Sequence, residues 1–150
     1  MTTRAGLCPA FLFEPDGRIL AIGRAFPDAE LLESKPPWTE WRRRDFDRHI
    51  GGPLLVKWGN RYLVGGRKSG EKFVGDRGPK TTLYWLNTDA DDGSKFLTEF
   101  AELPSAGDNS YPGFIQLSET RAVVSWYSSH EKNDAGAQIT AIYMADLELK

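Results

Sequence analysis

Residues 108–127, DNSYPGFIQLSETRAVVSWY, place two short apolar runs on either side of a polar turn. Runs of this length around a tight turn are typical of a β-hairpin. The same pattern occurs twice earlier in the chain. Residues 11–24 (FLFEPDGRILAIGR) and 54–67 (LLVKWGNRYLVGGR) align with residues 114–127 (FIQLSETRAVVSWY). The sequence therefore contains three copies of one hairpin.

The aligned copies share an arginine directly after the turn, and their starts are spaced by 43 and 60 residues. This spacing is the length of a four-stranded propeller blade whose outer loops vary. We therefore predict an all-β chain of about three four-stranded antiparallel blades. They form one partial β-propeller domain over residues 1–150. The expected blades cover residues 7–50, 51–107 and 108–150.

Composition narrows the class of protein. A net charge of −2 over 150 residues gives no basic field, so nucleic acid is not an expected partner. No apolar run approaches the roughly 18 residues that span a bilayer, so no membrane association is expected. Residues 1–7 have no secretory apolar core, which leaves the location of the protein unknown. The single cysteine, Cys8, excludes an intrachain disulfide.

Strands outside the three hairpins are predicted from local patterns. Ser34–Trp41 is expected to be a stiff turn that ends on a buried indole, because Pro36-Pro37 excludes regular structure there. The basic run Arg42–Asp45 is interpreted as a solvated face, and Arg43–His49 as at most one helical turn. Further strands are expected at Ala29–Glu33, Thr81–Asn87, Phe96–Leu103 and Ile139–Leu147.

The chain resembles the sialidase-like, Asp-box (bacterial neuraminidase repeat) family of six-bladed β-propellers. An Asp box reads Ser-x-Asp-x-Gly-x-Thr-Trp, and Asp89–Phe96 and Ser34–Trp41 are degenerate copies. The runs SYPG (residues 110–113), YSSHE (127–131) and AIYMADLEL (141–149) are similar to the last blade of sialidase-related proteins. The resemblance covers nearly the whole chain, but only the C-terminal half of such a propeller.

Hairpins arranged radially bring equivalent residues to one face. The start of the first strand and the end of the second lie side by side, which predicts that Arg24, Arg67, Tyr111 and Tyr127 converge. Two arginines and two tyrosines at a channel mouth favour an anion site, because a guanidinium fork holds a carboxylate through two charge-assisted hydrogen bonds. The alternative is that Arg24 and Arg67 merely end their strands in solvent.

The resemblance assigns roles to these residues. Sialidases hold the substrate carboxylate with three arginines and attack the sugar with a tyrosine. The resemblance implies that Tyr111 is the nucleophile and that Arg24 belongs to the arginine triad. Arg67 is the candidate second arginine, with Arg77 as its rival. A base partner is needed for the phenol, but Cys8 stands where the family has a glutamate. Tyr111 can also be an ordinary packed aromatic.

Metal and cofactor chemistry is not expected. Asp89–Gly93 is similar to a calcium loop, but its glycine comes one position early, so an Asp-box turn is favoured. His49 and His130 are far apart and have no cysteine cluster, which argues against zinc. His130 follows the expected channel mouth and is either a residue that lines the site or an exposed loop histidine.

Two classes of function remain open at this point. The chain is either part of a glycoside hydrolase-like protein that acts on an acidic or other glycan, or a non-catalytic carbohydrate-binding or structural relative. If active, it would be a glycosidase of the exo-α-sialidase type. A five-bladed glycosidase propeller is less favoured, because its carboxylates would need positions held by Cys8, Gly52 and Tyr111. Open-ended blades also predict a homodimer or a missing set of N-terminal blades.

Overall fold

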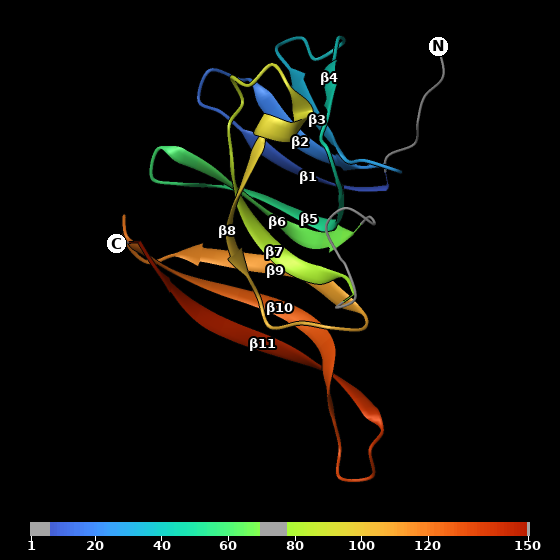
Figure 1. Ribbon diagram of the computed structural model, residues 1–150. Coiled ribbons are helices and arrows are strands. Elements are labelled where there is room, and N and C mark those ends of the chain that lie inside the picture. The colour runs from blue at the N-terminus through green and yellow to red at the C-terminus, as the bar shows by residue number, and fades with distance from the viewer. Residues whose placement is uncertain (1–6, 70–77, 150) are drawn as a thin grey trace.

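The computed structural model describes residues 7–69 and 78–149 of the chain. It is an all-β structure with three antiparallel sheets stacked face against face, as Figure 1 shows from the first sheet at the top to the third at the bottom. This arrangement confirms the predicted all-β propeller-blade fold. The first sheet has the order β1-β2-β3-β4, the second β5-β6-β7-β8 and the third β11-β10-β9. The third sheet thus has three strands in the described residues, where four were expected.

The strand bounds follow the predicted hairpins closely. The first sheet contains β1 (Leu7–Phe13), β2 (Ile19–Arg24), β3 (Glu30–Ser34) and β4 (Arg42–Asp45). The second contains β5 (His49–Trp58), β6 (Arg61–Ser69), β7 (Lys80–Leu86) and β8 (Leu97–Glu102). The third contains β9 (Asn109–Gln116), β10 (Arg121–Lys132) and β11 (Gln138–Glu148).

Two apolar cores lie between the sheets. Leu20, Ile22 and Leu31 of the first sheet pack against the second sheet around Val64 and Tyr84. The second core joins the second and third sheets, and its centre is the buried Trp58. The indole of Trp58 lies 5.4 Å from the ring of Phe114, measured between centroids, and its Nε1 donates to the Ser118 carbonyl at 3.2 Å. The second sheet is therefore covered on both faces.

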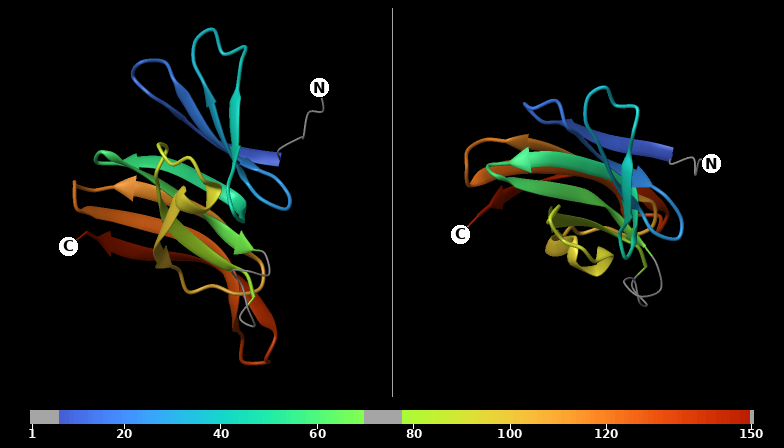
Figure 2. Two further views of the ribbon diagram at one scale, coloured as in Figure 1. Left: turned by 45° about the horizontal axis from the view of Figure 1, so that its top comes forward. Right: turned by 90° about the horizontal axis from the view of Figure 1, so that it is seen from above.

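The first and last sheets each have one face that no described residue covers. Alternation along β1 points Leu12 inward and leaves Phe11 and Phe13 exposed. Ile142 and Met144 of β11 are exposed in the same way, with Ile115 of β9 on the same face of the third sheet. Figure 2 shows these two sheets at opposite ends of the stack. The stack therefore ends in apolar surface on both sides.

The segment around β4 corrects two expectations and confirms most of a third. Trp41 is exposed, so the turn over residues 34–41 does not end on a buried indole. Residues 42–45 form an outer strand, with Glu33 paired to Arg42, and no helical turn occurs at 43–49. The solvated face predicted for this run is confirmed at Arg42, Arg43 and Asp45, which are exposed. Arg44 is the exception: it is half-buried, pairs with Glu33 and donates to the Thr88 carbonyl, in the turn after β7, at 2.8 Å. These acceptors bind Nη1 and Nη2 of Arg44 and tie the outer strand to the turn after β7, whereas its buried Nε has no hydrogen-bond partner among the described residues.

The second degenerate Asp box also differs from its expected form. Asp92, and not Asp91, accepts a hydrogen bond from the Ser94 backbone N–H at 2.9 Å. This bond caps the one-turn 3-10 helix η2 (Gly93–Lys95), the only helix in the described residues. Phe96 follows it and packs edge-on against Phe46 at 5.7 Å. The turn therefore buries its aromatic residue without reproducing the Asp-box register.

No described helix is long and apolar enough to cross a membrane.

Candidate functional site

A cluster of polar and aromatic side chains lies where β9 begins and where β6 and β10 approach their ends. Nη1 of Arg67 lies 2.8 Å from Oδ1 of Asp108, and the Tyr127 hydroxyl donates to the same oxygen at 2.8 Å. The ring of Tyr111 stacks on that of Tyr127, with centroids 6.1 Å apart and planes inclined by 26°. We call Arg67, Asp108, Tyr111 and Tyr127 the tyrosine–arginine site.

Each of the three hairpins carries a β-bulge at this end. The pairing shifts between Leu7 and Ala10 in the first sheet and between Gly51 and Leu54 in the second. In the third it shifts between Ser125 and Tyr127, opposite β9. Two residues then oppose one: Cys8-Pro9, Gly52-Pro53 and Tyr111-Pro112. Proline suits a bulge because it has no N–H to give to the ladder.

The residue that pairs next to each bulge is a predicted site residue. Arg24 pairs with Leu7, Arg67 with Gly51, and Tyr127 with Ser110. Bulges bend a strand and redirect its side chains, and they are frequent next to active sites. The three bulges therefore place Arg24, Arg67 and Tyr127 at equivalent positions on one end of the stack.

Tyr111 has an unusual backbone conformation for a tyrosine. Its φ is 48°, in the left-handed region, and Gly52 at the equivalent position of the second sheet has a φ of 55°. Glycine adopts this conformation without cost, whereas a residue with a side chain loses about 1–2 kcal/mol. The Tyr111 side chain is 56% exposed, so a buried contact does not explain the strain. Strained residues held in this way are concentrated at functional sites.

Hydrogen bonds from Ser110 hold the strained segment against the second sheet. Ser110 is buried; its hydroxyl donates to the Gly51 carbonyl and accepts from the backbone N–H of Arg67 at 3.1 Å. Buried Asn109, next to it, accepts a hydrogen bond from Thr81 at 2.7 Å. These bonds connect sheets two and three at the site, so the strain is balanced by the surrounding structure.

His49 and Phe26 connect Arg24 to this site. The buried His49 ring stacks on Phe26 at 4.1 Å, and its Nδ1 lies 2.8 Å from the Ala25 carbonyl. The guanidinium of Arg24 lies 5.7 Å from the Phe26 centroid. Burial lowers the pKa of His49, and the nearby guanidinium groups of Arg24 and Arg67 lower it further. Arg24 and Arg67 therefore both lie near the His49 ring, at the same end of their sheets.

Gly51 has no side chain, and this lets Arg67 and His49 pack close to the backbone. A Cβ atom built on Gly51 would lie 3.3 Å from Nε of Arg67 and 3.3 Å from Nε2 of His49. Among the described residues, no carboxylate pairs with Arg24. Arg67 is half-buried and already pairs with Asp108. Of the two predicted anion-binding arginines, Arg24 is thus the one whose charge no described carboxylate neutralises.

Two predicted site residues remain, Arg77 and His130. Arg77 is outside the described residues. His130 lies within β10, where its Nδ1 is 2.9 Å from the Ser128 hydroxyl and its ring is 4.4 Å from that of Tyr143. It is half-buried in a strand, so it is not an exposed loop histidine, and no hydrogen bond or ring contact joins it to the tyrosine–arginine site.

Asp108 is the site residue that the sequence analysis did not identify. Its carboxylate is 69% exposed and holds both Arg67 and Tyr127. Burial raises the pKa of the Tyr127 phenol, and its hydrogen bond to Asp108 raises it further. Tyr127 is therefore a neutral donor at neutral pH. Within the described part of the chain, no group of three or more metal-ligating side chains occurs.

Comparisons with known proteins show the fold. No protein-family model matches the sequence, and no curated protein matches it. A solved structure of a protein of unknown function from Dyadobacter fermentans is similar, with a TM-score of 0.64 at 19% identity over 94% of this chain. An alpha-L-arabinanase from Penicillium chrysogenum, complexed with arabinobiose, has a TM-score of 0.63 at 13% identity over 98% of this chain.

This chain spans 38% of the first neighbour and 47% of the second. At such identities the likeness shows the fold and leaves the activity open. The chain therefore has a propeller-like fold related to that of a glycoside hydrolase. The sialidase-like assignment and its Asp boxes are not confirmed by these neighbours.

Proposed function

We propose that this chain binds a glycan at the tyrosine–arginine site without hydrolysing it. The observation that carries the proposal is the strained, exposed Tyr111, held where the equivalent residue is glycine. A ring fixed in this way offers a flat apolar face toward solvent. Sugar rings have one face of C–H groups that packs on such a surface, while their hydroxyls need hydrogen-bond partners at the edge.

The neighbours of Tyr111 supply those partners. Asp108 is exposed and accepts hydrogen bonds, and the half-buried guanidinium of Arg67 donates them. For an acidic sugar, Arg24 is the cation that suits the carboxylate, because Arg67 is paired with Asp108. The expected ligand is accordingly an acidic or other glycan, and its carboxylate, where present, points toward the first sheet.

The described site is poorly equipped for hydrolysis. Most glycosidases use two carboxylates that flank the scissile bond. Asp108 is the carboxylate of the tyrosine–arginine site, and it pairs with Arg67 and Tyr127. A tyrosine nucleophile needs a base because its ordinary pKa is near 10. Asp108 hydrogen-bonds to Tyr127, whose pKa is raised, and so does not provide an activated phenolate.

The substitution Tyr111→Gly tests the proposal directly. Glycine relieves the left-handed strain, so the free energy of unfolding of the variant should equal that of the parent or exceed it by up to about 1 kcal/mol. Binding should nevertheless weaken at least tenfold. The measurement is isothermal titration of the purified chain with N-acetylneuraminic acid, glucuronic acid and arabinobiose. Arg121→Ala, at the opposite end of β10, is the matched control and should bind as the parent does.

The opposite pattern would overturn the proposal. If Tyr111→Gly lost stability and kept its affinity, Tyr111 would be a packing residue. If none of the three sugars bound to the parent chain, the site would not be a glycan site of this kind. Arg24→Ala separates acidic from neutral ligands, because it should weaken binding of the two acids and leave arabinobiose unaffected.

A further inference from the structure

A second hollow lies at the opposite end of the stack from the tyrosine–arginine site. It is formed where β2 begins and where β3 and β7 end, and its volume is about 910 Å³. We call it the blade-edge pocket. The residues that form its polar lining come from the first sheet and from the end of β7: Arg18, Glu33, Lys35, Glu40, Arg42 and Asp89. Its volume lies within the range of about 300–1,000 Å³ typical of small-molecule sites.

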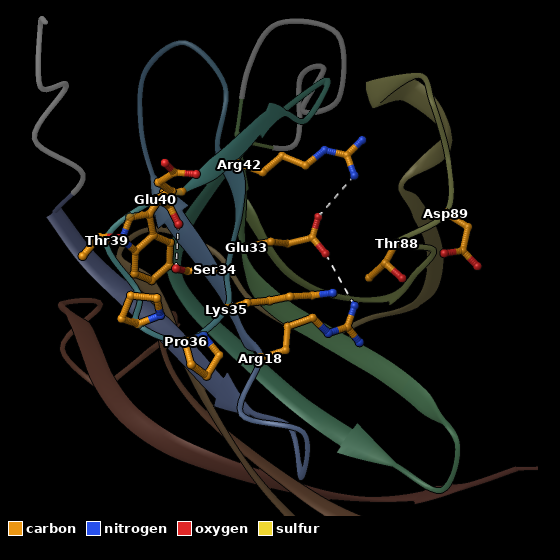
Figure 3. Close-up of a pocket in the computed structure, with 12 residues that line it drawn as sticks. Arg18, Glu33, Ser34, Lys35, Pro36, Thr39, Glu40, Arg42, Thr88 and Asp89 are labelled. Carbon is orange, nitrogen blue, oxygen red and sulfur yellow. Dashed lines mark hydrogen bonds and ion pairs between the residues drawn. The ribbon is translucent and has the colours of Figure 1, made fainter.

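The polar lining is preorganised by contacts within the protein. Glu33 lies between Arg18 and Arg42, as Figure 3 shows. Its Oε1 is 3.5 Å from Nη1 of Arg18, and its Oε2 is 3.9 Å from Nη1 of Arg42. Nη2 of Arg18 also donates to the Tyr62 hydroxyl at 3.1 Å. On the opposite wall, the Ser34 hydroxyl donates to the Glu40 carbonyl at 2.6 Å. Groups held before binding lose little freedom when a ligand arrives.

The charges of the lining balance. Three side chains of the lining are cationic and three are anionic. Glu33 pairs with two of these cations and also with Arg44, which does not line the pocket. A charged ligand would therefore meet repulsion and attraction together. A neutral ligand with many hydroxyls can instead accept from the guanidinium and ammonium groups and donate to the carboxylates. Hydrogen bonds that involve a charged donor or acceptor are shorter and stronger than those between two neutral groups.

Trp41 supplies an aromatic wall. Its side chain lines the pocket and is 39% exposed, although a large indole is normally buried. Trp38 in the same turn is 45% exposed, but it does not line the pocket, and its Nε1 donates to the Gly17 carbonyl at 3.0 Å. No described acceptor pairs with the indole N–H of Trp41. Trp41 therefore offers a ring face and a free donor to a ligand.

We propose that the blade-edge pocket binds a neutral oligosaccharide, with Trp41 stacked on one sugar ring. Glu33 and Arg18 bind hydroxyl groups of that ring or of its neighbour. This site is separate from the tyrosine–arginine site and does not depend on it. A chain with both sites would hold a glycan at two points on opposite ends of its blades.

Tryptophan indole N–H signals in two-dimensional NMR of the labelled chain test this inference. The probes are arabinobiose, cellobiose and maltotriose, with sodium glucuronate as the acidic comparison. The Trp41 signal should shift saturably with at least one neutral probe. Trp41→Ala should weaken that binding at least tenfold, whereas Trp38→Ala should change it less than twofold. Tyr111→Gly should leave the Trp41 response unchanged, which separates the two sites.

Three results would overturn the inference. The first is a Trp41 signal that none of the neutral probes moves, at concentrations up to their solubility. The second is an equal loss of affinity in Trp41→Ala and Trp38→Ala. The third is tighter binding of glucuronate than of the neutral probes. Trp41→Phe is the control for a folding defect in Trp41→Ala, because it keeps an aromatic face and should retain part of the affinity.

Discussion

The substitution Gly52→Ala tests how the second and third sheets build the tyrosine–arginine site. Gly52 has a φ of 55°, which alanine adopts only at a cost of about 1–2 kcal/mol. Its new Cβ would also lie 2.7 Å from Oγ of Ser110 and 3.1 Å from the ring of Tyr111. Ser110 does not move freely, because it bonds to the Gly51 carbonyl and to the Arg67 N–H.

Gly59→Ala is the matched control for the cost of the left-handed backbone conformation. Gly59 has a φ of 60°, and a Cβ there would meet nothing within 4 Å. Its substitution should therefore cost only the strain, about 1–2 kcal/mol. Overpacking at Gly52 adds about 1–3 kcal/mol. The total expected for Gly52→Ala is roughly 2–5 kcal/mol of unfolding free energy, from the strain and overpacking together.

Equilibrium urea unfolding, followed by tryptophan fluorescence, measures both losses. Glycan binding should fall with Gly52→Ala, because Tyr111 must move, and should survive Gly59→Ala. Equal destabilisation by the two variants would refute the reasoning, since it would mean that Gly52 does not contact the third sheet. Unchanged glycan binding in Gly52→Ala would separate Tyr111 from the ligand.

Four further outcomes are expected. Trp58→Ala should lower the free energy of unfolding in urea by about 3–5 kcal/mol, since it leaves a cavity in the core between the second and third sheets; a loss below 1 kcal/mol would contradict this core. The pKa of His49 is lowered, so its contribution to stability is present above about pH 6.5 and lost as the pH falls; the free energy of unfolding in urea should be lower at pH 5.5 than at pH 7.5, and His49→Gln should reduce that difference. Tyr111→Phe should keep glycan affinity within about twofold, and assays with an aryl sialoside should show no turnover in variant or parent; hydrolysis by either would restore the enzymatic hypothesis. Because Phe11 and Ile142 mark two uncovered apolar faces, we propose that two copies pair through them; light scattering showing a monodisperse 16.8 kDa monomer would contradict this pairing.

The hairpins were predictable because their signals are local. Period-two alternation and the Asp16-Gly17 turn determine β1 and β2, and Gly17 has the positive φ, 83°, that this turn requires. The repeat then extended the prediction to the other sheets. The convergence of Arg67, Tyr111 and Tyr127 also followed, because equivalent hairpin positions lie at the same end of stacked sheets.

Features that depend on contacts between sheets could not be predicted in the same way. Arg44 was assigned to solvent because its neighbours in sequence are charged, yet its acceptors are Glu33 of β3 and the Thr88 carbonyl in the turn after β7. Asp108 was not predicted as a site residue, since a single acidic residue before a strand is common. A signal was present for the bulges: Cys8, Gly52 and Tyr111 each precede a proline at the same place in the hairpin.

Titration of the isotope-labelled chain with N-acetylneuraminic acid, followed by backbone amide NMR, tests the central claim most directly. The proposal predicts saturable shifts confined to residues 51–52, 66–67, 108–111 and 127, with Arg24 moving as the carboxylate docks. The sugar should be recovered unchanged. Shifts confined to the opposite end of the blades, or the absence of any saturable shift around Tyr111, would contradict glycan binding at the tyrosine–arginine site.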